Sequence, residues 1–115
     1  MAIDGKCFWL SPADEDPDWQ PDDKESLILY VENGPMILAA ATLEPPCTLC
    51  GARLGSVSWQ YDGVWLWPGD TGHYVRLHGF RLPDAFVDDV RARNYQCVAV
   101  DEIDYEKLPW PSDPA

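Results

Sequence analysis

Uninterrupted apolar runs separated by turn-forming residues give this chain its main pattern. Residues 27–31 and 36–43 are apolar almost throughout, and a turn sequence that contains Asn33-Gly34 separates them. Asn-Gly favours tight turns, and apolar runs of this length are typical of buried strands. We therefore predict a hairpin of two buried strands that ends at Pro45-Pro46. The shorter run 7–10 predicts an edge strand.

A second hairpin is predicted by the runs 56–61 and 64–67, which flank the turn pair Asp62-Gly63. Side chains two residues apart share one face of a strand, so Trp65 and Trp67 should point the same way. We expect these two indoles and that of Trp59 to pack between the sheet and a helix.

Helix signals follow the second hairpin. Asp70 can cap a helix that runs to about residue 77, and Gly79 suits the position after its end. Pro83 favours the first turn of another helix, which runs to about residue 93. A last strand is predicted over 97–100.

These elements predict an α+β fold, an antiparallel sheet of about five strands with two short helices on one face. A length of 115 residues suits one domain. We assign residues 1–107 to this domain, with an acidic loop over 11–25. Residues 108–115, which include three prolines, are expected to form a tail.

Acidic residues are concentrated at the two ends of the chain, whose net charge is −12. Residues 1–25 carry eight acids against two lysines, and residues 99–115 carry five acids against one lysine. Such a field repels nucleic acid and anionic membranes and attracts basic proteins. The alternative is that the acids serve only solubility.

The cellular compartment is constrained by what the sequence contains. No run approaches the roughly 18 apolar residues that would span a bilayer. The N-terminus has neither the basic start nor the apolar stretch that is typical of signal peptides. We expect a cytoplasmic protein, in which four cysteines serve as thiols or metal ligands rather than disulfides.

Metal chemistry is indicated by the sequence Cys47-x-x-Cys50-Gly51, which has the form of a zinc knuckle. The nearest candidates for two further ligands are His73 and His78. Residues five apart diverge by about 140° on a straight helix, so we expect the helix to loosen before His78. We predict zinc as the metal.

Other interpretations of these residues remain open at this stage. The two knuckle cysteines could be free thiols or a redox pair. The histidines could instead be a core residue and a residue that faces helix carbonyls. Cys7 and Cys97 are expected to be buried small hydrophobes, although they could replace the histidines as ligands.

Two tryptophans lie among acids and prolines, where a core role is not expected. Exposed aromatic residues ringed by charge are typical of protein interfaces. No nucleophile with an oriented base is recognisable, so we predict a protein that is not an enzyme. The expected partner-binding residues are Asp14, Glu15, Asp16, Asp18, Trp19, Asp22, Asp23 and Trp110.

The middle of the chain resembles a pattern of small uncharacterised bacterial proteins. This pattern is C-x-x-C-G, then D-G-x-W-x-W-P, then H-Y-V-x-x-H-x-x-R-L-P-x-x-F-V, and it covers about a third of the chain. It departs from this sequence at Thr71 and Gly72, where the pattern has Leu and Ala. Some such proteins look like immunity proteins of bacterial toxins. The matching residues are Cys47, Cys50, Gly51, Asp62, Gly63, Trp65, Trp67, Pro68, His73, Tyr74, Val75, His78, Arg81, Leu82, Pro83, Phe86 and Val87.

Charge and resemblance together favour a non-catalytic binding protein of the immunity or inhibitor type. It would neutralise a basic partner protein, such as a bacterial toxin enzyme, and would bind neither nucleic acid nor membrane. One alternative is a small structural-zinc domain that acts as an interaction or regulatory module. A second alternative is a thiol redox protein.

Overall fold

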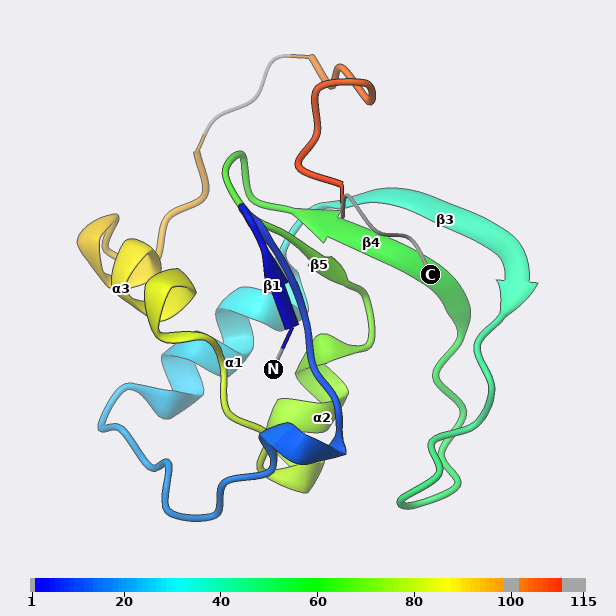
Figure 1. Ribbon diagram of the computed structural model, residues 1–115, viewed down its shortest axis with the longest axis vertical. Helices are drawn as coiled ribbons and strands as arrows, with labels where there is room; N and C mark the ends of the chain where they lie inside the picture. Colours follow the sequence, from blue (N-terminus) through cyan, green and yellow to red (C-terminus); the bar gives the residue numbers. More distant parts are fainter. Residues whose placement is uncertain (1, 99–101, 111–115) are drawn as a thin grey trace.

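A computed structural model describes residues 2–98 and 102–110 (Figure 1). This part of the chain contains the strands β1 (Ala2–Asp4), β2 (Cys7–Trp9), β3 (Met36–Leu43), β4 (Ser56–Tyr61) and β5 (Leu66–Pro68). Its α-helices are α1 (Lys24–Asn33), α2 (Thr71–His78) and α3 (Asp84–Ala92), and a 3-10 turn, η1 (Pro12–Asp14), precedes α1.

The five strands form one sheet in the order β1-β2-β5-β4-β3, and the helices gather on one side of it (Figure 1). All pairings are antiparallel except that of β2 with β5, which is parallel through Cys7 and Leu66. The α+β class and the number of strands are therefore confirmed. The sheet is mixed rather than antiparallel, and three α-helices accompany it where two were predicted.

The segment 27–31 is helical, so the predicted first hairpin is wrong. It lies within α1, where Leu27, Ile28 and Val31 are buried while Leu29 is 46% exposed. Buried positions at i, i+1 and i+4 mark one face of a helix. A short apolar run fits a strand or a buried helix equally well, and the tertiary packing selected the helix here.

Two further strand assignments need correction. Strand β3 was predicted to be buried, but it is the edge strand of the sheet and most of its side chains are exposed, including Met36 and Leu43. Strand β2 was predicted to lie at the edge, but it lies between β1 and β5. The N-terminal strand β1 supplies the missing neighbour of β2, and it was not predicted.

An aromatic cluster forms the core between the sheet and the helices. The ring of Phe8 lies 6.1 Å from Trp65, 6.0 Å from Trp67 and 4.8 Å from Phe86. All four side chains are at most 1% exposed. The indole N–H of Trp67 donates to the side-chain oxygen of Gln60 over 3.0 Å, so its polar atom is satisfied inside the core. The predicted core role of Trp65 and Trp67 is confirmed.

Strand β4 turns its polar side chains toward this core. Ser58 and Gln60 are buried, whereas Trp59 is half-buried and packs edge-on against Trp110, with ring centroids 5.6 Å apart. The expectation that Trp59 packs between sheet and helix is therefore wrong. Because side chains alternate along a strand, Trp59 lies on the opposite face from Gln60.

The C-terminal segment covers this second face of the sheet. Leu108 is buried, and the Tyr105 hydroxyl donates to the Ile37 carbonyl over 2.8 Å. The predicted tail therefore packs on the sheet over 108–110, while 111–115 lies outside the described residues. No strand is present at Cys97 and Val98, and the rest of the predicted strand 97–100 also lies outside them.

A buried carboxylate connects the turn after β4 to two helices. Asp62 is 1% exposed and accepts hydrogen bonds from the Tyr30 hydroxyl at 2.5 Å and from the Arg93 guanidinium at 2.9 Å. It also accepts from the backbone N–H groups of Val64 and Trp65. The sequence predicted only a turn residue at this position.

The two predicted helices after β5 are confirmed with small shifts of their bounds. Helix α2 begins at Thr71, whose hydroxyl donates to the Pro68 carbonyl over 2.7 Å. It ends at His78, and the next residue, Gly79, has φ 65°, a left-handed conformation that favours glycine.

Candidate metal centre

The loop between β3 and β4, residues 44–55, forms a narrow hairpin that we call the 44–55 arm. The Glu44 amide donates to the Gly55 carbonyl over 2.8 Å, and the Cys47 amide donates to the Ala52 carbonyl over 2.9 Å. Between these pairs the chain turns tightly from Cys47 to Gly51. Gly51 has φ 73°, a left-handed conformation that favours glycine. This turn brings the two cysteines of the knuckle together.

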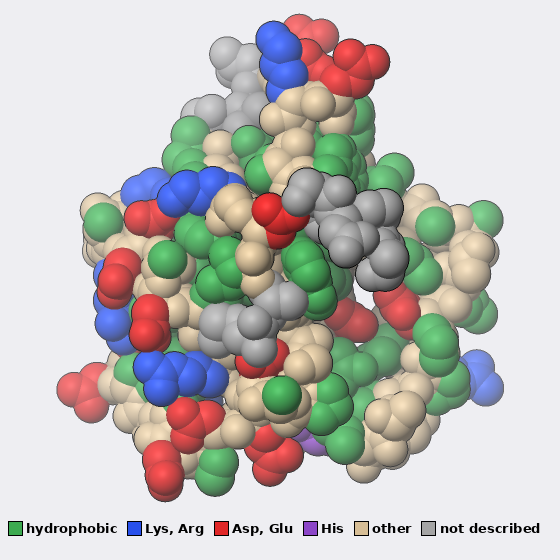
Figure 2. Space-filling view, in the orientation of Figure 1, with side chains coloured by type: hydrophobic (Ala, Val, Ile, Leu, Met, Phe, Trp, Pro, Cys, Tyr) green, Lys and Arg blue, Asp and Glu red, His purple; other side chains and the backbone are tan. Residues whose placement is uncertain are grey.

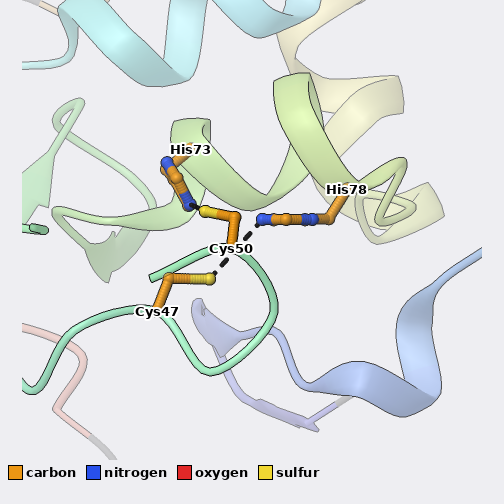
Figure 3. Close-up of side chains that lie close together, drawn as sticks. All are labelled: Cys47, Cys50, His73 and His78. Carbon is orange, nitrogen blue, oxygen red and sulfur yellow. Dashed lines mark hydrogen bonds between the residues drawn. The ribbon is translucent and has the colours of Figure 1, made fainter. Parts of the chain in front are cut away.

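Helix α2 supplies both histidines. It remains helical through His78, so the expected loosening before that residue is wrong. The tip of the 44–55 arm lies against the side of α2, and the two imidazoles extend to it from different turns of the helix (Figure 3). His73 and His78 leave the helix in different directions, since they are five residues apart. Both can still reach the same point, because the two thiols of the arm lie between their imidazoles.

All four ligand atoms converge on one point (Figure 3). The Cys47 sulfur lies 3.5 Å from Nε2 of His78, and the Cys50 sulfur lies 3.6 Å from Nε2 of His73. The ligand atoms of these four residues all lie within 4.8 Å of one another. Zinc bonds of about 2.3 Å to sulfur and about 2.0–2.1 Å to nitrogen place these atoms about 3.5 Å apart in a tetrahedron. The geometry therefore forms a candidate Cys2His2 zinc site.

The pKa shifts at the site favour metal binding, because a metal binds thiolates and neutral imidazoles and a lowered pKa favours both of these deprotonated forms. Burial raises the pKa of the Cys47 thiol, but the amide N–H groups of Leu49 and Cys50 and the Tyr74 hydroxyl more than offset this, so the pKa is lowered. The Leu49 amide lies 3.4 Å from the Cys47 sulfur. Burial and the neighbouring His78 lower the pKa of His73.

Tyr74 is a part of this centre that the sequence analysis missed. Burial, together with the negative charges of Asp70 and Cys47, raises the pKa of its hydroxyl to about 12, so it remains a hydrogen-bond donor at neutral pH. Its position four residues before His78 places both on one face of α2, which is the signal that could have identified it.

The other two cysteines lie outside the centre. Cys7 is buried in β2, as predicted, and burial raises the pKa of its thiol to about 11. Cys97 is exposed, so the expectation of a buried residue is wrong. Neither belongs to the group of residues that could hold a metal, which the structure assigns to Cys47, Cys50, His73 and His78.

Three of the acids expected to bind a partner make contacts within the fold. Asp14 is buried and accepts from the Ser11 amide over 2.8 Å. Asp16 forms an ion pair with Arg81, and Asp23 forms one with Arg91. The Arg91 guanidinium is the main reason that the pKa of Asp23 is lowered to about 2.

The remaining members of the expected partner-binding set differ in exposure. Glu15, Asp18 and Asp22 are exposed. The indoles of Trp19 and Trp110 are only half-buried, but Trp19 packs against the core and Trp110 against Trp59. The expectation that these two tryptophans have no packing role is therefore wrong, while partner binding by the tryptophans and by the acids stays a prediction.

Function has to be inferred from the fold and from the metal centre, because comparison with known proteins gives no match. No protein-family model matches the sequence, and no curated protein or solved structure is significantly similar to it. None of the described helices is both long and apolar enough to cross a membrane. Fold and geometry define a small α+β domain with a candidate Cys2His2 zinc site.

Proposed function

We propose that this protein is a non-catalytic protein-binding domain whose 44–55 arm is held in place by zinc. The observation that carries the proposal is the convergence of four soft or borderline ligand atoms within 4.8 Å. Four protein ligands complete the tetrahedral coordination of zinc and leave no open position for a water or substrate, which is the arrangement of structural sites. Such a site fixes a surface rather than performing a reaction.

The surface charge supports a basic protein as the partner. Among the described residues, six of the eight lysines and arginines form ion pairs with acids of the same chain, as Arg76 does with Glu25 and Glu32. The positive charge is thus largely neutralised internally, while Glu15, Asp18 and Asp22 remain exposed and form no ion pair within the described residues. A surplus of exposed acid increases the rate of association with a basic partner.

The more specific form of the proposal is an immunity or inhibitor protein that neutralises a basic toxin enzyme. It rests on this charge and on the resemblance of the middle of the chain to small bacterial proteins of that kind. The zinc-domain alternative, an interaction or regulatory module, uses the same centre with a different partner. The redox alternative requires the two knuckle thiols to be free.

Metal analysis of protein purified without chelator tests the centre. We expect about one zinc per chain, and loss of that zinc in Cys47→Ser and His73→Ala. Cys97→Ser is the matched control, because it removes an exposed thiol outside the centre and should keep full occupancy. Occupancy below about a tenth of an equivalent in the wild-type protein would reject the zinc site and favour free thiols.

Affinity capture from the native host tests the partner at low and moderate salt. We expect a basic protein whose association slows as salt rises. The triple variant Glu15→Gln, Asp18→Asn, Asp22→Asn should reduce this association. The control is Asp88→Asn, Glu102→Gln, Glu106→Gln, which removes three exposed acids elsewhere. Recovery of no protein partner, or equal capture by both triple variants, would contradict the proposal.

A further inference from the structure

A cavity lies between the 44–55 arm and the helical body, beside the metal centre. Its volume is about 260 Å³, and its lining includes Glu44, Thr48 and Leu49 on the arm and Asp70, Tyr74 and Phe80 on the body. Figure 2 shows a hollow on this side of the molecule, with acidic side chains among hydrophobic ones. The volume is slightly below the range of about 300–1,000 Å³ typical of drug-sized ligands, so it suits a single side chain.

Two carboxylates line this cavity, and no basic side chain shares its lining with them. Glu44 and Asp70 belong to its lining, which includes no Lys, Arg or His. Neither forms an ion pair within the described residues, in contrast to Asp16 and Asp23. Burial raises the pKa of both groups, and the charge of Asp70 further raises that of Glu44. Because both carboxylates line the same cavity, a cation bound there would interact favourably with both of them.

The rest of the lining is mixed: Leu10, Pro12, Pro68 and Phe80 form apolar walls on the body side, beside the hydroxyl-bearing side chains Ser11, Thr71 and Tyr74. A bare metal ion gains nothing from such walls. A long side chain with an aliphatic stem and a cationic head fits both parts, because the stem packs against the walls while the head reaches the carboxylates.

From this combination we infer that the cavity binds one arginine or lysine side chain of the basic partner. This inference rests on the proposed function and names the part of the surface that recognises the partner. The metal centre sets the shape of the cavity, because Thr48 and Leu49 lie between the two cysteine ligands and Tyr74 follows His73. Arginine is favoured over lysine, since its planar guanidinium can donate to two carboxylates at once.

The test uses the zinc-loaded full chain and two blocked tripeptides, glycine-arginine-glycine and its citrulline analogue. Citrulline has nearly the same shape as arginine but no charge. In amide NMR spectra we expect the arginine peptide to shift signals of Thr48, Leu49 and Phe80, with a dissociation constant on the order of 1 mM. The citrulline peptide should bind at least about tenfold more weakly. Equal binding of both peptides, or shifts elsewhere on the surface, would overturn the inference.

A charge-matched pair of variants locates the site. Glu44→Gln with Asp70→Asn should abolish the peptide-induced shifts, whereas Glu102→Gln with Glu106→Gln removes two exposed acids outside the cavity and should retain them. Retention of the shifts in the first variant would refute the site. Because the citrulline comparison uses the wild-type protein, the inference remains testable even if this variant folds poorly.

The same variants separate failure of the inference from failure of the proposed function. If the arginine peptide binds in the cavity but the host yields no basic partner, the function is wrong and the cavity site stands. If a basic partner binds the cavity variant as tightly as the wild type, the cavity inference is wrong and the function stands.

Discussion

The aromatic core and the 44–55 arm differ in what holds them in place. Phe8, Trp65, Trp67 and Phe86 are almost completely buried and contact one another. In the arm, by contrast, Cys47 is buried while Leu49 is 47% exposed. Burial of apolar area stabilises the core without help, because each large side chain contributes roughly 1.5–3 kcal/mol. The arm buries too little for this, so in our proposal a zinc bridge to helix α2 replaces packing.

Removal of an indole from the core should have the largest effect. We expect Trp67→Ala to lower the free energy of unfolding by about 3–5 kcal/mol, because it leaves a cavity and removes the partner of the buried Gln60 oxygen. Urea denaturation followed by circular dichroism measures this loss. Trp110→Ala is the control, since its half-buried ring should cost far less. Equal losses would mean that the aromatic core does not dominate stability.

Removal of the buried carboxylate should come next. We expect Asp62→Ala to cost about 3 kcal/mol, because it leaves the Arg93 guanidinium and the Tyr30 hydroxyl without their buried acceptor. The same denaturation experiment measures it. Asp84→Ala is the control, since its ion pair with Arg81 is largely exposed and worth little. A loss for Asp62→Ala no larger than that of the control would show that the network is not structural.

Removal of zinc should affect the arm before the core. With free zinc about 100-fold above its dissociation constant, chelation should lower stability by about 3 kcal/mol. Hydrogen exchange should then rise in residues 44–55 and stay slow at Trp65 and Trp67, because only the arm depends on the metal. Uniform loss of protection across both regions would contradict this division.

The smallest expected effect is the pH dependence of the ion pair between Asp23 and Arg91, which lies in the helical body and not in the arm. The lowered pKa of Asp23, about 2 against an ordinary 3.8, means that its ion pair with Arg91 stabilises the body fully above about pH 4. This stabilisation is lost as the pH falls through about 2. Because solvent screens this partly exposed pair, Asp23→Asn should cost only about 1 kcal/mol at pH 7 and progressively less below pH 4. Stability curves against pH measure the difference, and a constant cost across this range would refute the linkage.

As the pH falls, the arm should be released before the ion pair between Asp23 and Arg91 weakens. Zinc dissociates once its histidine and cysteine ligands are protonated, and this occurs at a higher pH than protonation of Asp23. Zinc release and Asp23 linkage can be followed in one titration. Zinc that is retained down to pH 2 would contradict the Cys2His2 assignment.

The amino-acid sequence alone determined those features that depend on local pattern or on residue chemistry. Turn pairs and two-residue alternation located the hairpin of β4 and β5 and the core role of Trp65 and Trp67. Capping and breaking residues located α2 and α3. The scarcity of soft ligands left few ways to complete a knuckle, so His73 and His78 could be identified with Cys47 and Cys50 before the fold was known.

Only the tertiary structure decided where each apolar run is buried. Residues 27–31 could form a strand or a helix, and the contact of α1 with the aromatic core selected the helix. The same packing left β3 at an exposed edge and turned Gln60 rather than Trp59 inward. Burial of Asp62 depends on Tyr30 and Arg93, which lie about thirty residues away on either side. Such contacts join distant segments, whereas periodicity reports only neighbours along the chain.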